Sequence, residues 1–162
     1  MLGVTCPVVS DGGGIPHLTE NPMPTYQTQE DLLNEKSVCK HLSALWDLKI
    51  YKLHPALKVD LALVRGTTIE GFMEVKCRSY TMQRLEELGG FFTSLVKWRE
   101  AQDMCRAARL PYHVVVRDGE GVIWHSKDPC PSHIVMGGRY DRNDPRDIEP
   151  MAVIPMSQFS KA

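Results

Sequence analysis

The chain has 162 residues, of which 43% are hydrophobic and 24% are charged, and its formal net charge is −1. This length and composition are typical of one globular domain with a hydrophobic core. The near-neutral charge excludes a strongly basic polyelectrolyte. Any contact with nucleic acid must therefore come from local groups of Lys and Arg side chains.

The cysteines and the apolar segments predict a protein of the cytoplasm. The sequence holds 5 cysteines and no Cys-x-x-Cys pair, which indicates reduced thiols rather than a disulfide framework. The first residues lack the basic segment and the apolar core of a signal peptide. No apolar run approaches the roughly 20 residues that span a bilayer, so we expect no membrane partner.

The N-terminal third predicts an irregular arm, a helix and a strand. Residues 1–27 contain several prolines and a Gly-Gly-Gly run and show no periodicity, which is typical of an irregular arm. Residues 28–46 have apolar side chains mostly at helical spacing, with acidic residues in the first turn. Residues 48–53 alternate between polar and apolar side chains and predict a strand. No linker or repeat follows, so residues 28–162 form one predicted domain.

The next segments predict a mixed sheet flanked by helices. The order of elements is then helix, three strands, helix and two strands, and the second long helix permits a crossover to a parallel strand. A short helix with Thr81 as its cap is predicted before the second long helix. The predicted strands cover residues 58–66, 68–78, 112–118 and 121–126, and the predicted helices cover 81–88 and 93–110.

Three charged residues stand inside two of these apolar strands. Asp60 lies in the first strand, and Glu74 and Lys76 share one face of the second, because side chains alternate along a strand. An antiparallel pairing brings Asp60 close to Glu74, with a bulge or a slipped register to absorb the unequal distance from the turn. Buried charges need a partner or a metal. The alternatives are a Mg²⁺ site facing a phosphate and a salt bridge within the sheet.

Asp60 followed by Glu74-Val75-Lys76 resembles the motif of the PD-(D/E)XK nuclease superfamily, although Val59 stands where the name has Pro. The similarity covers roughly residues 28–117. It is closest to small phage-encoded members, whose segments resemble EVKCR, SLVKW, LPYHVVVRDGEGVIW and DIEPMAVIPMSQF. The resemblance implies a restriction-endonuclease-like core of order αβββαβ, which matches the order predicted above.

The resemblance also implies roles for individual residues. Asp60, Glu74 and the backbone carbonyl of Val75 would bind Mg²⁺, for which Mn²⁺ can substitute, and Lys76 would be the catalytic lysine. A further acid is expected on the first helix, where Glu35 matches best and Asp31, one turn earlier, is the alternative.

Two basic residues complete the predicted site. Lys97 occupies the position on the second long helix where relatives carry a Gln or Lys near the scissile phosphate. The alternative for Lys97 is a lysine whose stem covers the edge of an apolar stripe. Arg78 is a candidate phosphate contact, with an ordinary solvated surface position as its alternative.

The sequence therefore predicts a Mg²⁺-dependent nuclease that hydrolyses DNA, active in phage DNA replication, recombination or processing in the host cytoplasm. No small-molecule cofactor is expected, and the chain is either a monomer or a homodimer. Two alternatives stay open: a Holliday-junction-resolvase-like enzyme, and a non-catalytic nucleic-acid-binding or assembly protein that retains the fold. The motif alone does not choose between endonuclease and exonuclease activity.

Overall fold

A computed structural model gives the fold of the chain and describes residues 29–138 and 148–162. The predicted arm at residues 1–27 lies outside this part of the chain. None of the helices in the described part is long and apolar enough to cross a membrane.

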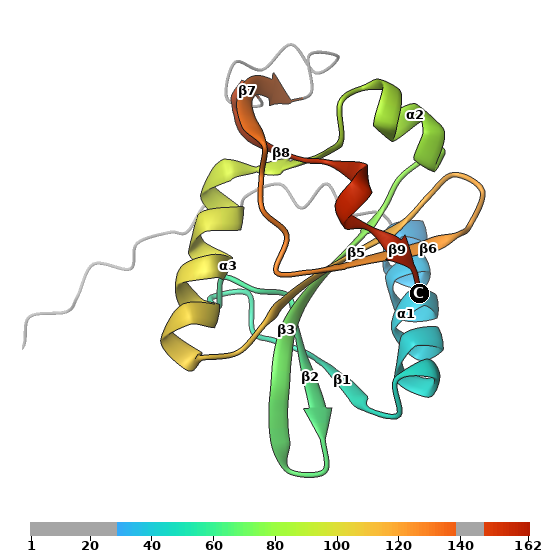
Figure 1. Ribbon diagram of the computed structural model, residues 1–162. Helices are drawn as coiled ribbons and strands as arrows, with labels where there is room; N and C mark the ends of the chain where they lie inside the picture. The colour runs from blue at the N-terminus through green and yellow to red at the C-terminus, as the bar shows by residue number, and fades with distance from the viewer. Residues whose placement is uncertain (1–28, 139–147) are drawn as a thin grey trace, which may run out of the picture.

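A central sheet and a smaller second sheet form the fold (Figure 1). The helices are α1 (Gln29–Leu45), α2 (Met82–Glu87) and α3 (Leu95–Ala108), with a 3-10 turn at Met156–Gln158. The strands are β1 (Lys49–Lys52), β2 (Leu61–Arg65), β3 (Thr68–Cys77), β4 (Phe91–Ser94), β5 (Tyr112–Arg117), β6 (Ile123–Lys127), β7 (His133–Gly138), β8 (Ile148–Ile154) and β9 (Ser160–Lys161). The central sheet has the order β1-β2-β3-β5-β6-β9, and the second sheet has the order β4-β8-β7.

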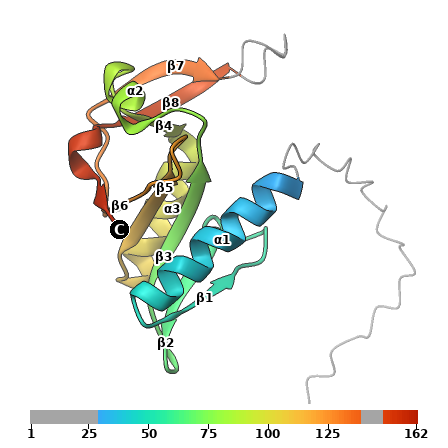
Figure 2. The same ribbon diagram turned by 90° about the vertical axis from the view of Figure 1, so that its right-hand side faces the viewer.

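The predicted α/β architecture is confirmed. β1, β2 and β3 pair antiparallel, whereas β3 and β5 pair parallel, so the chain crosses over between them through α3. α1 and α3 cover opposite faces of the central sheet (Figures 1 and 2). The sequence order αβββαβ is present in α1, β1 to β3, α3 and β5, with α2 and β4 inserted before α3.

Local sequence explains where several elements begin and end. Gly66 has a φ of 59°, a left-handed conformation that favours glycine, and it lies in the turn that joins β2 to β3. The Thr81 side chain accepts a hydrogen bond from the backbone N–H of Arg84 and so caps α2, as predicted. α3 ends at Arg109, which takes a left-handed conformation two residues before Pro111.

Each face of the central sheet has its own hydrophobic core. Under α1 lies a cluster that includes Val38, Leu42, Met73, Val75 and Val115. Under α3 and the second sheet lies a larger cluster of residues from most of the other elements, namely Val59, Ala62, Phe72, Leu85, Phe91, Ala101, Cys105, Tyr112, Val114, Val116, Ile154, Met156 and Phe159. β5 contributes to both clusters, which explains its continuous apolar sequence.

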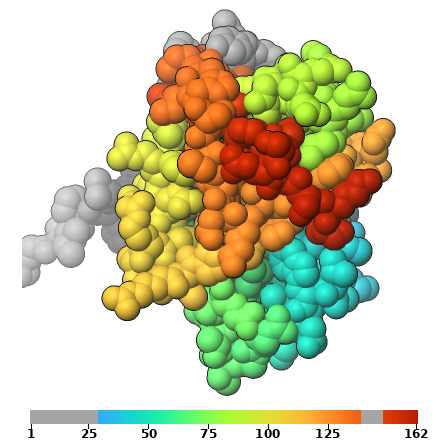
Figure 3. Space-filling model, in the orientation of Figure 1, coloured from blue at the N-terminus to red at the C-terminus, as the bar shows by residue number. Residues whose placement is uncertain are grey.

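The second sheet was missed by the sequence reasoning. The predicted helix 93–110 begins only at Leu95, because Thr93 and Ser94 belong to β4, which pairs with β8. At the start of β4, a Cβ on Gly90 would lie 2.4 Å from the carbonyl oxygen of Ile154, so only glycine fits there. After β8 the chain forms the 3-10 turn, which lies beside α2 (Figure 3). It then forms β9, which pairs with β6 and extends the central sheet.

Candidate functional site

Glu74 and Lys76 form an ion pair on the face of β3 that also carries Phe72. The Lys76 Nζ and the Glu74 Oε1 are 2.6 Å apart. Glu74 is only 7% exposed, whereas the Lys76 side chain is 27% exposed. The alternation along β3 places both side chains on the α3 side of the sheet and leaves Val75 in the core under α1. The structure therefore buries an acid at this position and supplies it with a partner.

Asp60 reaches the same pair from the segment that enters β2. The prediction that Asp60 lies inside a strand was wrong: β2 begins at Leu61, and the Asp60 carbonyl accepts a hydrogen bond of 2.9 Å from the Leu53 N–H. Its Oδ2 nevertheless lies 4.0 Å from the Lys76 Nζ, and its side chain is 46% exposed. Asp60 thus forms the solvent-facing side of the group.

A bulge in the hairpin brings Asp60 to this position. Leu61 pairs with Met73, and the register shifts between Leu63 and Val64, so that β3 has one more residue than β2 between the turn and the site. Extending this register by one residue places Asp60 opposite Glu74. Of the two predicted alternatives, the structure has the bulge.

Tyr112 is a site residue that the sequence reasoning missed. Its hydroxyl donates a hydrogen bond of 2.7 Å to Glu74 Oε2, the carboxylate oxygen that Lys76 does not contact. Tyr112 opens β5 and pairs with Phe72 of β3, so its ring lies on the same face as Glu74. A tyrosine at the start of an otherwise β-branched strand was the available signal, because a buried phenol needs a hydrogen-bond partner.

The electrostatics of the group favour charged Glu74 and charged Lys76. Burial alone would raise the pKa of Glu74, but Lys76, the Tyr112 hydroxyl and Lys97 together hold it below its usual value. Burial would likewise lower the pKa of Lys76, yet Glu74 and Asp60 raise it. The two carboxylates therefore surround a permanent cation, which is the environment that also suits a metal ion.

The two predicted basic residues lie on the side of the sheet that carries this group. Lys97 on α3 acts electrostatically on Glu74. Arg78 follows β3 directly, and its guanidinium lies 5.4 Å from the centre of the Phe91 ring. Burial lowers the pKa of Arg78, and the nearby Glu74 carboxylate opposes this effect. Both side chains thus lie within electrostatic reach of Glu74.

Glu35 is not brought to this group. Its Oε1 forms an ion pair with the Lys52 Nζ at 2.8 Å. Glu35 also lies near Cys39, and burial together with Glu35 raises the pKa of the Cys39 thiol to about 11. α1 packs on the opposite face of β3 from Glu74. Asp31, the alternative acid, acts on the pKa of Cys77, which belongs to that same opposite face.

The donor set suits a hard divalent cation. Glu74 on β3 and Asp60 in the segment that enters β2 both lie near the Lys76 ammonium. Mg²⁺ and Mn²⁺ take oxygen ligands and keep several waters, so two protein carboxylates are a sufficient core for such a site. Within residues 29–138 and 148–162, no three His, Cys, Asp or Glu side chains converge as a metal-binding group. Binding through the Val75 carbonyl stays a prediction.

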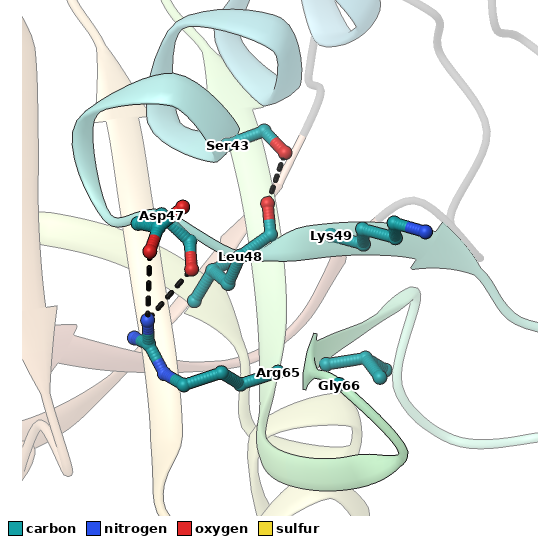
Figure 4. A pocket seen from close by; sticks show the side chains of 7 residues that line it. Ser43, Asp47, Leu48, Lys49, Arg65 and Gly66 are labelled. Carbon is teal, nitrogen blue, oxygen red and sulfur yellow. Dashed lines mark hydrogen bonds and ion pairs between the residues drawn. The ribbon is translucent and has the colours of Figure 1, made fainter.

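Two hollows in the surface lie away from this group. One hollow, of about 300 Å³, lies at the junction of α1, β1 and the β2–β3 turn (Figure 4). There the Arg65 guanidinium donates to the Asp47 carbonyl oxygen at 2.6 Å, and the Ser43 hydroxyl donates to the Leu48 carbonyl oxygen. These contacts satisfy carbonyls at the end of α1. The lining residues thus hold the segment between α1 and β1 against the end of β2.

The other hollow, of about 340 Å³, contains a histidine pair. His113 Nδ1 and His125 Nε2 are 2.8 Å apart, and the two rings are stacked with centroids 5.1 Å apart. Trp46 lies edge-on to His125 at 4.9 Å. Burial, His125 and Lys127 lower the pKa of His113 to about 4, so the pair is neutral near pH 7. Its hydrogen bond joins β5 to β6, and Trp46, which follows α1, packs against both rings.

Comparison with known proteins adds a family assignment. A family model described as "phage putative PDDEXK endonuclease" matches residues 22–162. A search of curated proteins found no match, and a search of solved structures found none either. The match covers all four of Asp60, Glu74, Lys76 and Lys97.

Proposed function

The chain belongs to the phage PD-(D/E)XK endonuclease family, and we propose that it is a Mg²⁺-dependent enzyme that hydrolyses phosphodiester bonds in DNA. The observation that carries the proposal is the convergence of Asp60 and Glu74 on Lys76, with Glu74 buried and held charged. A salt bridge built only for stability gains little from burial, because desolvation of both ions offsets their attraction.

Each residue of the group has a role in this proposal. Asp60 and Glu74 would hold the cation, which would supply an activated water and stabilise negative charge on the phosphate. Lys76 orients the attacking water or neutralises charge that develops in the transition state. Its ion pair with Glu74 keeps it protonated until a cation competes for the carboxylate.

DNA would approach from the side that carries Lys97 and Arg78. Both act electrostatically at Glu74, and both are cationic groups suited to a backbone phosphate. The net charge of −1 means that attraction to DNA comes from this local group rather than from the whole surface. The enzyme would act in the host cytoplasm during phage DNA replication, recombination or processing.

A cleavage assay with several substrates tests this function. The purified protein is incubated with linear, nicked, single-stranded, covalently closed circular and four-way DNA, with Mg²⁺, with Mn²⁺ or with a chelator. We expect metal-dependent cleavage, and cutting of the closed circle would identify an endonuclease. Preference for the four-way substrate would favour the resolvase-like alternative.

A Lys76→Ala variant is the control for this assay, because it leaves both carboxylates in place. Equal cleavage by wild type and Lys76→Ala would reveal a contaminating nuclease. Absence of metal-dependent cleavage on every substrate, together with retained DNA binding, would replace the enzyme proposal with the non-catalytic binding alternative.

A further inference from the structure

We infer that Tyr112 is a positioning residue that fixes the Glu74 carboxylate for metal binding. This inference rests on the proposed function, because it assigns Glu74 to a metal. The Tyr112 hydroxyl donates to Glu74 Oε2 at 2.7 Å, while the Lys76 ammonium lies 2.6 Å from Oε1. The hydroxyl therefore sets the orientation of the carboxylate and leaves Oε1 for exchange between Lys76 and a cation.

The Tyr112 backbone is held rigidly on both sides. Its N–H donates a hydrogen bond of 2.8 Å to Asp128 Oδ1, and its carbonyl accepts one of 2.7 Å from the Asp128 N–H. Phe72 of β3 is its partner across the parallel ladder, and the Phe72 N–H donates to the Pro111 carbonyl at 3.0 Å. The donor is thus attached to the strand that neighbours its acceptor, with little freedom to move.

The ring of Tyr112 is equally restricted. Tyr112 is only 2% exposed and belongs to the core cluster that includes Val59, Ala101 and Cys105. A buried aromatic ring with two torsion angles loses little entropy when its hydroxyl is directed to one acceptor. The hydroxyl also lies within electrostatic reach of Asp60. Its hydrogen bond to the buried Glu74 carboxylate therefore distinguishes it from a tyrosine that only fills the core.

Groups that orient metal ligands usually affect metal affinity more than the chemical step. Their removal typically lowers metal affinity or activity about 10- to 100-fold. If Tyr112 acts only through Glu74, then a variant without the hydroxyl should need more metal but recover most of its rate at saturation. A residue that serves only the fold would lower thermal stability without changing the metal requirement.

Tyr112→Phe tests this inference, since it keeps the ring and removes only the donor. Two quantities are measured on wild type and variant: the Mn²⁺ dissociation constant without DNA, by calorimetry, and the metal concentration that gives half-maximal cleavage. We expect both to rise about 10-fold, with the maximal rate within about threefold of wild type. Tyr51→Phe on β1, a tyrosine that is 50% exposed, is the matched control and should change neither quantity.

The outcomes separate this inference from the proposed function. If Tyr112→Phe bound Mn²⁺ as tightly as wild type and cleaved DNA at the same metal concentration, the positioning role would be overturned and the nuclease proposal would stand. A wild type that neither binds Mn²⁺ nor cleaves DNA would overturn both. If Tyr112→Phe does not fold, Tyr112→Met replaces it, because a flexible apolar side chain fills the same space without a donor.

Discussion

The two faces of the central sheet bury polar groups in different ways. On the α3 side, Glu74 and Lys76 are ionised and pair with each other. The Tyr112 hydroxyl also stabilises the Glu74 carboxylate, and Asp60 also stabilises the Lys76 ammonium. On the α1 side, the polar pair next to the core is His113 with His125, which is neutral near pH 7 and shares one hydrogen bond. A single sheet thus has an ionic group on one face and an uncharged one on the other.

This difference indicates which group has a chemical task. A neutral hydrogen-bonded pair between two strands costs little free energy to bury, because neither ring carries a charge into the interior. A buried carboxylate costs several kcal/mol to desolvate, and its pairing with lysine only offsets that cost. Retention of both ions on the α3 side therefore favours a function there, whereas the α1 side is explained by packing alone.

The largest expected effect comes from Glu74→Gln, which keeps the shape of the side chain and removes its charge. We expect DNA cleavage to fall at least about 1,000-fold, equivalent to about 4 kcal/mol in the activation barrier. Steady-state cleavage rates at saturating metal give the comparison. Glu70→Gln is the control on the same strand, where Glu70 pairs with Arg65 at 2.9 Å, and it should retain activity. Equal losses in both variants would refute the assignment of Glu74.

The next effect concerns the opposite face and is one of stability. Leu42 on α1 is 0% exposed, so Leu42→Ala should lower the free energy of unfolding by about 3 kcal/mol. Leu45→Ala on the same helix, at a leucine that is 53% exposed, should change it by less than about 0.5 kcal/mol. Denaturant unfolding measures both. If the folded Leu42→Ala protein lost cleavage as completely as Glu74→Gln, the two faces would not be functionally separate.

The histidine pair predicts a smaller, pH-dependent effect. The pKa of His113 is lowered to about 4, so the folded state opposes protonation that the unfolded chain accepts near 6.5. The stabilisation is therefore complete above about pH 6.5 and is lost as the pH falls towards 4. Partial solvent screening limits the loss to about 1–2 kcal/mol.

Unfolding midpoints between pH 7 and pH 4 measure this loss. His113→Phe keeps an aromatic ring beside Trp46 and should flatten the dependence on pH. His41→Gln, at an exposed histidine of α1, is the control and should follow wild type. A His113→Phe profile as steep as that of wild type would assign the acid sensitivity to other groups.

The sequence predicted the central sheet well because its signals are local. The alternation in β3 placed Glu74 and Lys76 on one face, and the β-branched run of β5 predicted a strand there. Thr81 and Pro111 marked the ends of helices. These signals need only the neighbouring residues and the period of a strand or helix.

What the sequence did not reveal depends on contacts between distant residues. β4 is short and precedes a helix, and only its pairing with β8, some 60 residues away in the chain, makes it a strand. The Tyr112 hydroxyl reaches Glu74 because β5 happens to pair with β3 in one register. Such partners are set by the tertiary fold, so a pattern within either strand could not identify them.

Glu35→Gln gives the smallest expected effect and sharpens the comparison between the faces. Glu35 was predicted to bind metal, but its carboxylate contacts Lys52 at 2.8 Å on the α1 side. If this position persists with DNA bound, cleavage should stay within about threefold of wild type. Stability should fall by less than about 1 kcal/mol, since the Lys52 partner is 53% exposed.

Lys52→Met is the matched control, because it removes the same ion pair from the other side. Equal, small losses of stability and full activity in both variants would confine Glu35 to the fold. A large loss of cleavage in Glu35→Gln but not in Lys52→Met would instead show that α1 moves its acid to the metal when substrate binds. In that case the α1 face would share the chemistry that we propose for the α3 face alone.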